Sequence, residues 1–500
     1  MLKRQHFSVI ALVGVLSLAA CGGTSTSSDT TANPLNTTTE FVVNPIVWTA
    51  CDGSTNTKVE CGNIEVPFDY ADPEQGSFVL YVKKHNAASP ADRIGSMMVN
   101  PGGPGFGGSS LADDARYYFS QDLIDRFDII AWDPRGTGES TPAVNCVDTF
   151  DEYFGLDSPP ETPDEKQALI DASQAFNDKC AENSGTILPY ISTQASAQDI
   201  NSLRLALGEE KVSFFGFSYG SELGTTWATM FPETVRAIVV DGAVDPNASS
   251  TEEGMNQAKG FEGQLATFLK QCSEKTTCAF HNGGKAEAAF DKLVLDIDAT
   301  PLEVSKDRTP VTQGVLFTAV AQAMYSDYYW PQLSEALSEA QNGDGKGILQ
   351  LYDDYYQRKD DGTYGNELEA FLAISCLDDP GATSTDEVDS HIEDFIAAAP
   401  RLGGNFAYGY SCALWPVKQA AKVNITGKGA GPIVVVGTTG DPATPLDSTR
   451  KMALSLEQGI LIVVDANQHT GYGANNCVVK AVDDYLINLS VPKNETTCKD

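Results

Sequence analysis

Short apolar runs rich in β-branched and aromatic residues predict the strands of a sheet. Two early runs, residues 63–70 and 77–83, are expected to pair antiparallel. Shorter runs typical of buried strands follow at residues 96–100, 127–133, 212–215, 234–241, 431–437 and 459–465. Helical patterns lie between several of them, for example at residues 197–207 and 222–230. Strands that alternate with helices indicate an α/β protein, with a mostly parallel sheet covered by helices on both faces.

The hydrophobic pattern changes after Gly242. Residues 243–415 are mainly helical in pattern, rich in Ala, Glu, Gln and aromatic residues, with few runs typical of buried strands. Strand-like runs then resume. A helical block between two sheet-forming parts predicts an insertion that caps the C-terminal edge of the sheet. We therefore expect a first core part over residues 45–242, a helical cap over 243–415 and a second core part over 416–500.

The first twenty residues have the pattern of an export signal. Two basic residues precede an apolar run over residues 9–20, which is too short to span a membrane as a permanent helix. The run ends in L-A-A-C-G, which resembles the bacterial lipobox, where the cysteine is acylated and becomes the mature N-terminus. We predict a lipoprotein signal peptide over residues 1–20, a lipid anchor on Cys21 and a flexible tether over 21–44. An ordinary secretory signal that contains a cysteine is the alternative.

The amino-acid composition limits the kinds of molecule that the protein is expected to bind. Of the 500 residues, 42% are apolar and 20% are charged, which is typical of a folded protein with one large domain plus an insertion, or with two domains. There are 33 basic and 68 acidic residues, a net charge of −35. Such a chain is not expected to bind nucleic acid, or to dock on anionic lipid through its own charge. The acidity slightly favours cationic peptides as ligands, and we expect a monomer.

The cysteines predict disulfides and not a metal site. Besides Cys21 there are ten, an even number in an exported chain. Proximity in sequence suggests the pairs Cys51–Cys61, Cys146–Cys180, Cys272–Cys278, Cys376–Cys412 and Cys477–Cys498. Neither C-x-x-C nor H-E-x-x-H occurs, so we expect no zinc site and no cofactor.

The sequence G-F-S-Y-G at residues 216–220 joins a predicted strand to a predicted helix. G-x-S-x-G in this setting is typical of a nucleophile elbow, in which a strained turn presents the serine above the sheet. Its glycines let strand and helix approach closely. Ser218 is therefore the candidate nucleophile, and the Tyr219 N–H is a candidate donor to the reacting carbonyl oxygen. A glycine-rich turn of another α/β protein is the alternative.

A second glycine-rich loop, residues 102–108, follows the strand at 96–100. It fits G-x-G-x-x-G, but a dinucleotide site needs a helix that begins within the loop, and Pro104 suits that poorly. A serine hydrolase uses a loop in this place for the second backbone donor of its oxyanion hole. We favour that interpretation, with Gly103 N–H as the donor and Gly102 as the alternative.

A serine nucleophile needs a base, and the base needs an orienting acid. His469 follows the strand at 459–465, and Asp441 follows the strand before it. The order Ser218, Asp441, His469 is that of α/β-hydrolases. Asp447 is the alternative acid. The remaining histidines lie in the signal segment, beside an early strand or in the cap: His6, His85, His281 and His391.

Further motifs occur in a specific order over residues 45–500. They are V-P-F-D-Y at 66–70, N-P-G-G-P-G at 100–105, D-P-R-G-T-G at 133–138, G-F-S-Y-G at 216–220, G-D-P-A-T-P at 440–445, and His469. With them, the chain resembles the prolyl-aminopeptidase-like α/β-hydrolases, in particular the secreted tripeptidyl-aminopeptidase branch with its TAP-like C-terminal region. Cys376 and C-A-L-W at 412–415 also resemble that branch. The cytosolic relatives have histidine in place of Pro101.

The resemblance implies an α/β-hydrolase fold and an exopeptidase that releases short N-terminal fragments from peptides, of tripeptidyl- or prolyl-aminopeptidase type. Such an enzyme needs a carboxylate for the substrate's ammonium group, and Glu222, Asp378 and Asp379 are open candidates. A carboxylesterase or lipase with the same triad is the first alternative. The second, from a different class, is a peptide-binding lipoprotein without catalysis. In each case we expect an exported protein, secreted or held at the outer face of the cell membrane.

Overall fold

The computed structural model describes residues 41–52 and 56–499. The predicted signal peptide, Cys21 and most of the predicted tether lie outside the described residues. Among the described residues, no helix is both long enough and apolar enough to cross a membrane.

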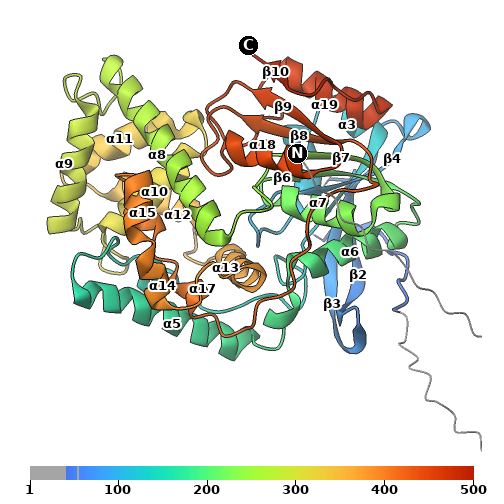
Figure 1. The fold of residues 1–500 in the computed structure, drawn as a ribbon, viewed down its shortest axis with the longest axis horizontal. Helices are drawn as coiled ribbons and strands as arrows, with labels where there is room; N and C mark the ends of the chain where they lie inside the picture. The colour runs from blue at the N-terminus through green and yellow to red at the C-terminus, as the bar shows by residue number, and fades with distance from the viewer. Residues whose placement is uncertain (1–40, 53–55, 500) are drawn as a thin grey trace, which may run out of the picture. The chain divides into compact units, whose positions relative to one another are not determined.

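Ten strands of the described chain form one sheet, in the order β1-β2-β3-β5-β4-β6-β7-β8-β9-β10 (Figure 1). They are β1 (Thr49–Ala50), β2 (Val59–Asp69), β3 (Asp72–His85), β4 (Gly95–Asn100), β5 (Phe127–Trp132), β6 (Val212–Phe217), β7 (Val235–Asp241), β8 (Ile433–Thr438), β9 (Gly459–Val464) and β10 (Thr496–Cys498). The pairs β1–β2, β2–β3 and β3–β5 are antiparallel, and the pairs from β5 to β10 are parallel. The prediction of a mostly parallel sheet is confirmed.

Helices cover both faces of the sheet because its parallel strands are apolar on both sides. Successive side chains of β6 show this: Phe214 packs with Leu203 and Trp227 on one face, and Phe215 packs with Leu123 on the other. The covering helices are α1 (Ser110–Asp113), α2 (Ala115–Tyr118), α3 (Gln121–Arg126), α6 (Thr193–Ala206), α7 (Gly220–Met230), α18 (Leu446–Ser455) and α19 (Asn476–Asn488). Short 3-10 turns lie at η1 (Pro90–Asp92), η2 (Leu188–Tyr190), η3 (Pro232–Thr234) and η4 (Asp327–Tyr329).

Between β7 and β8 the chain is helical (Figure 1). This helical region packs around an apolar cluster of its own. Phe268, Leu316 and Leu337 are among its buried side chains. Its helices are α8 (Ser250–Glu274), α9 (Ala286–Ala299), α10 (Gln313–Met324), α11 (Trp330–Ala340), α12 (Lys346–Tyr355), α13 (Glu367–Asp378), α14 (Thr385–Ser390), α15 (Ile392–Ala398), α16 (Gly403–Phe406) and α17 (Tyr410–Ala413). We call this region the cap.

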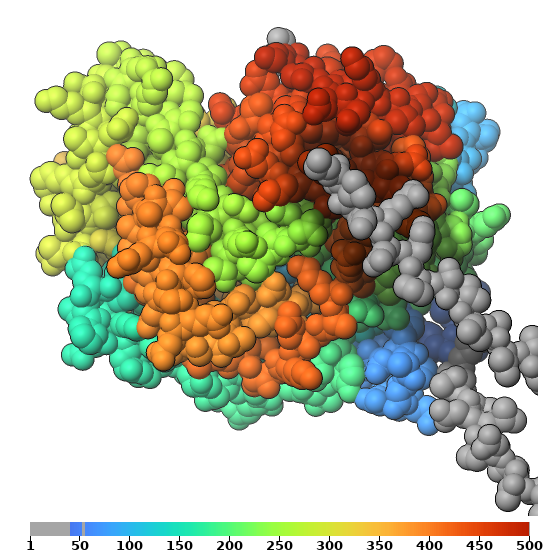
Figure 2. Space-filling model, viewed as in Figure 1, coloured from blue at the N-terminus to red at the C-terminus, as the bar shows by residue number. Residues whose placement is uncertain are grey.

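Two helices that precede β6 also contact the cap: α4 (Asp151–Phe154) and α5 (Pro163–Ser184). The Asn177 side chain donates a hydrogen bond to the Ser411 carbonyl at 2.8 Å, and Lys166 pairs with Asp389. In Figure 2, α5 (teal) lies against the orange residues of α14 and α17. The helical region therefore combines two stretches of the chain, which the hydrophobic pattern did not indicate.

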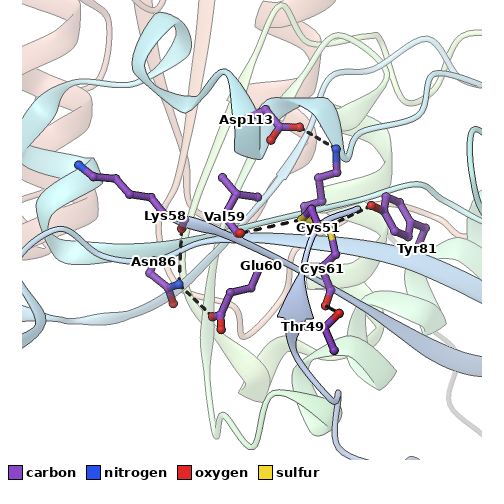
Figure 3. The surroundings of a disulfide bond; sticks show 10 residues. Thr49, Cys51, Lys58, Val59, Glu60, Cys61, Tyr81, Asn86 and Asp113 are labelled. Atoms are coloured by element: carbon purple, nitrogen blue, oxygen red, sulfur yellow. Dashed lines mark hydrogen bonds and ion pairs between the residues drawn. A yellow bond between two sulfur atoms is a disulfide. The ribbon is translucent and has the colours of Figure 1, made fainter. Parts of the chain in front are cut away.

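Ten cysteines among the described residues form five disulfides, with the pairing that proximity in sequence predicts. Cys51–Cys61 links the segment after β1 to β2, and the Tyr81 hydroxyl on β3 donates to Cys61 Sγ at 2.9 Å (Figure 3). Disulfides of this number are typical of proteins exported to an oxidising compartment.

A buried ion pair connects two of the sequence motifs. Arg135 of D-P-R-G-T-G and Asp199 of α6 are 0% and 1% exposed, and Arg135 Nε donates to Asp199 Oδ2 at 2.7 Å. Arg135 also donates to the carbonyls of Pro67 and Phe68, and the Tyr70 hydroxyl donates to Asp199 at 2.8 Å. Because a buried charge is stable only when its hydrogen bonds are satisfied, these contacts fix V-P-F-D-Y and D-P-R-G-T-G against one another.

Candidate active site

Ser218 occupies a strained turn between β6 and α7. Its φ is 53°, in the left-handed region that non-glycine residues rarely adopt. Its N–H donates to the Asp241 carbonyl at the end of β7, at 2.8 Å. A Cβ on Gly216 would lie 2.2 Å from the Gly220 carbonyl oxygen, so only glycine lets strand and helix approach this closely. The G-x-S-x-G pattern therefore has a steric cause at this turn.

The loop after β4 lies directly against this turn. A Cβ on Gly102 would be 2.8 Å from Ser218 Cβ and 3.3 Å from Tyr219 N. The Gly102 N–H already donates to Asn100 Oδ1 at 3.0 Å. Within the described part of the chain, the N–H groups of Gly103 and Tyr219 donate to no protein acceptor. This arrangement favours Gly103 over the alternative Gly102 and leaves both expected donors available to a substrate.

His469 and Asp441 are brought together after β9 and β8. His469 Nδ1 lies 2.9 Å from Asp441 Oδ1 and 3.0 Å from Oδ2. Asp441 also accepts from the backbone N–H groups of Ala443 and Thr444, at 3.0 and 2.8 Å. These bonds fix the carboxylate, which in turn orients the imidazole.

The electrostatics around His469 favour its protonated form. Burial lowers the pKa of His469, but the charge of Asp441 and the hydrogen bond to it outweigh burial, so the pKa is raised above its ordinary value. The backbone N–H of His469 donates to the Tyr325 carbonyl of the cap at 2.8 Å, which also fixes the loop. A base held in this way can accept the proton of a nucleophile without leaving its orienting acid.

Asp241 is a site residue that the sequence reasoning missed. Its carboxylate accepts from the N–H groups of Gly471 and Tyr472, at 2.7 Å each. Burial raises the pKa of Asp241 to about 7 against these two hydrogen bonds. With its carbonyl bonded to Ser218 N, Asp241 links the serine turn to the histidine loop. An acidic residue at the end of an otherwise apolar run was the available signal.

The alternative residues lie elsewhere. Asp447 is in the first turn of α18, and among the described residues no hydrogen bond or ion pair joins it to His469. His281 Nδ1 is bonded to the Cys272 carbonyl within the cap. Neither His85 nor His391 lines a cavity that Ser218 lines. In the described ranges, no group of three or more His, Cys, Asp or Glu side chains is placed to hold a metal ion.

Ser218 lies where two cavities meet. One, of about 350 Å³, is also lined by His469, and we call it the aromatic cavity after its rings: Phe106, Tyr325, Tyr329, Tyr355, Tyr356 and Phe371. The other, of about 270 Å³, is lined by Tyr219 but not by His469. We call it the acidic pocket after its carboxylates: Glu222, Asp245, Glu253, Asp378 and Asp379. A substrate bound at Ser218 can therefore extend into two chemically different spaces.

The carboxylates of the acidic pocket differ in how they are satisfied. Asp378 accepts from Thr193 N and Oγ1 at 3.0 and 2.6 Å, and Asp245 pairs with Lys451 at 2.7 Å. Asp379 accepts from backbone N–H groups of neighbouring turns. The two carboxylate oxygens of Glu253 are buried, and neither accepts a hydrogen bond. The Glu222 carboxylate likewise has no hydrogen bond or ion pair among the described residues, and Lys422 is the one cation among the described lining residues of this pocket.

Burial shifts these acids towards neutrality. It raises the pKa of Glu253 to about 7, helped by the charge of Asp245 and opposed by the nearby Asn256 amide. It also raises the pKa of Asp378 to about 7, against its hydrogen bonds to Thr193. The pKa of Glu222 is raised for the same reason. Of these residues, Glu253 was missed by the sequence reasoning, because it follows Glu252 in a helical first turn where acids are common.

Comparison with known proteins gives the wider relationship. Residues 399–498 match the family model described as TAP-like protein. The chain is 32% identical to serine protease Hip1 of Mycobacterium tuberculosis, over 91% of each chain. It is 32% identical to carboxylesterase B of the same organism, over 90% of this chain and 89% of that one. It is 29% identical to tripeptidyl aminopeptidase of Streptomyces coelicolor, over 91% of this chain and 86% of that one.

The fold and these relationships define the class: the protein is a serine hydrolase with the α/β-hydrolase fold. Within that class, the chain belongs to the TAP-like family of serine proteases and tripeptidyl aminopeptidases. The predicted fold class and family are confirmed.

Proposed function

We propose that the protein is an exported serine exopeptidase that removes short fragments from the free N-termini of peptides. The observation that carries this proposal is the acidic pocket beside Ser218, with the unpaired carboxylate of Glu253 buried in it. A buried carboxylate without a partner is costly, and a cationic ligand group would offset that cost. The α-ammonium of a peptide is such a group.

The proposed reaction uses Ser218, His469 and Asp441. Ser218 Oγ attacks the carbonyl carbon while His469 takes the hydroxyl proton, and the developing oxyanion accepts hydrogen bonds from the N–H groups of Gly103 and Tyr219. One such donor is worth roughly 3 kcal/mol of transition-state stabilisation. His469 then gives the proton to the leaving amine as the bond to it breaks. Water, deprotonated by His469, hydrolyses the acyl-enzyme and frees the N-terminal fragment.

The acidic pocket would set where the chain is cut. A substrate ammonium bound there lies at a fixed distance from Ser218, so the number of residues between the two determines the length of the released fragment. Glu253, Glu222 and Asp378 each gain from this binding, because a nearby positive charge favours the ionised carboxylate. An acetylated N-terminus has no charge to offer and should bind poorly.

Export and anchoring complete the proposal. We propose that Cys21 is acylated and holds the enzyme, as a monomer, at the outer face of the cell membrane through the tether over residues 21–44. The five disulfides support an oxidising location. Replacing Cys21 by Ala should move the protein from the membrane fraction to the soluble fraction; unchanged membrane association would contradict the lipid anchor.

An esterase is the second candidate, favoured by the relationship to carboxylesterase B and by the aromatic cavity. Amide and ester hydrolysis share the proposed triad, so substrates must separate them. The test is hydrolysis of aminoacyl, prolyl and tripeptidyl amides, each with a free and an acetylated N-terminus, and of a short-chain ester, with Ser218→Ala as control. We expect cleavage of the amides with a free N-terminus but not of the acetylated ones, and loss of this cleavage in the variant. Ester turnover without amide cleavage would replace the exopeptidase with an esterase.

A further inference from the structure

The aromatic cavity lies on the side of Ser218 where His469 is found. Ser218, Gly103 and Phe371 line both cavities, so the two spaces meet at the nucleophile and the expected oxyanion donor. His469 lines the aromatic cavity but not the acidic pocket. The Tyr325 ring stands edge-on to the His469 ring, with centroids 5.7 Å apart. The base is thus part of the wall of this cavity.

The position of His469 indicates which cavity takes which half of a substrate. In acyl transfer the base gives its proton to the leaving amine, so the leaving group must lie beside His469. The proposed function places the substrate's ammonium group in the acidic pocket. The space that remains for the residue after the cleaved bond is then the aromatic cavity.

The lining of the aromatic cavity indicates which residue fits there. Rings of Tyr325, Tyr329 and Tyr355 come from the cap and face the same space as Phe106 of the oxyanion loop. The only charged groups among its described lining residues besides His469 are Asp354 and Glu367, both acidic. Aromatic rings prefer edge-to-face and offset contacts with other rings, and the two carboxylates disfavour an acidic ligand.

We propose, resting on the function proposed above, that the aromatic cavity is the leaving-group site and selects peptides with an aromatic residue directly after the cleaved bond. Tyr329 and Tyr355 determine this specificity. The residue after the bond departs during acylation, so peptides with the same N-terminal fragment form the same acyl-enzyme. The residue after the cleaved bond therefore affects kcat/KM. Where deacylation limits turnover, kcat is the same for all peptides with the same N-terminal fragment.

The experiment uses the full-length protein and peptides with a free N-terminus. Each carries the same alanine fragment, of the length that the amide series identifies, followed by residue X and alanine amide, with X as Phe, Leu, Gly or Asp. Mass spectrometry identifies the cleaved bond and the rate. We expect kcat/KM for Phe to exceed that for Gly by about tenfold or more, with Leu between them and Asp lowest.

Two cavity variants and one matched control locate the effect. Tyr329→Ala and Tyr355→Leu should reduce the Phe-to-Gly ratio of kcat/KM severalfold, and labelling of Ser218 by a fluorophosphonate shows that both variants are folded. Tyr328→Ala should leave the ratio unchanged, because Tyr328 neighbours Tyr329 but is 80% exposed and does not line the cavity. Tyr355→Phe keeps the ring and should keep the preference.

Several results would overturn the inference. Equal kcat/KM for all four peptides, with a free N-terminus still required, would reject it and leave the exopeptidase proposal standing. Asp preferred over Phe, or a loss of preference in Tyr328→Ala equal to that in Tyr329→Ala, would also reject it. Failure of the proposed function would look different, because the ester would be cleaved and none of the peptides.

Discussion

The sheet core and the cap contribute different kinds of group to the site. The core supplies Ser218, Asp441 and His469 from the ends of parallel strands, together with the backbone N–H groups of Gly103 and Tyr219. Hydrogen bonds to neighbouring core groups hold Ser218, Asp441 and His469 in place. The cap supplies mainly side chains that line the two cavities beside Ser218.

We therefore expect the core to carry out the reaction and the cap to select the substrate. Core groups depend on backbone geometry that few sequences can adopt, such as the positive φ of Ser218. Cap groups such as Glu253 and Tyr329 project from helices and can change without altering that geometry. Substitutions in the core should therefore abolish turnover of every substrate, and substitutions in the cap should change which substrates are used.

Ser218→Ala tests the core side of this division most severely. We expect kcat to fall by about 10⁶-fold for amides and ester alike, because no other group can form the acyl-enzyme. Turnover and labelling by a fluorophosphonate are the measurements, with circular dichroism to show that the variant is folded. Substantial remaining turnover, with no label at another serine, would move the chemistry away from this turn.

Asp441→Asn should have the next largest effect. The amide cannot stabilise the protonated imidazole that forms during the reaction, so kcat should fall by about 10⁴-fold. Asp447→Asn is the matched control, because Asp447 lies in the same segment without contacting His469, and it should retain nearly full activity. If the two variants exchanged these outcomes, Asp447 would be the orienting acid.

Glu253→Gln tests the cap side. For peptides with a free N-terminus, kcat/KM should fall by about tenfold to a hundredfold, the worth of a charge-assisted hydrogen bond. Ester hydrolysis should be unchanged, since it uses only core groups. Glu274→Gln, an exposed acid near the other end of α8, should change neither. Equal losses on peptide and ester would mean that Glu253 supports the structure instead of recognising the substrate.

The smallest expected difference between the core and the cap is in the pH dependence of kcat/KM. His469 must be neutral to act as base, and its raised pKa places the fall in kcat/KM with acid above the ordinary value near 6.5, for ester and peptide alike. Peptides should lose a further factor below about pH 7 as Glu253 is protonated, and again above about pH 8 as their α-ammonium loses its proton. Glu253→Gln should reduce this additional loss at acid pH for peptides and leave the ester profile unchanged, and Asp378, whose pKa is also raised to about 7, should account for what remains. Identical profiles for peptide and ester would contradict a charged recognition site.

The sequence predicted much of the core because the residues that determine each core element are adjacent in the chain. The elbow at residues 216–220 has its strand, glycines and helix within one stretch, and the strand ends that precede Asp441 and His469 were visible in the hydrophobic pattern. The acidic pocket was only partly predicted: Glu222, Asp378 and Asp379 were candidates, and all three line it. Glu253 was missed because nothing in the adjacent residues says that its carboxylate becomes buried, and Asp241 was interpreted only as the end of a strand.

The sequence by itself determined the sheet, the serine turn, the order of the candidate triad and the pairing of nearby cysteines, because apolar periodicity, turn sterics and short loop closure act over neighbouring residues. Only the tertiary structure decided that α5 joins the cap, that Asp241 bridges the serine turn and the histidine loop, and that two different cavities meet at Ser218. Those features depend on which distant segments pack together. Burial, and with it the charge state of an acid, is set by that packing and not by the residues on either side.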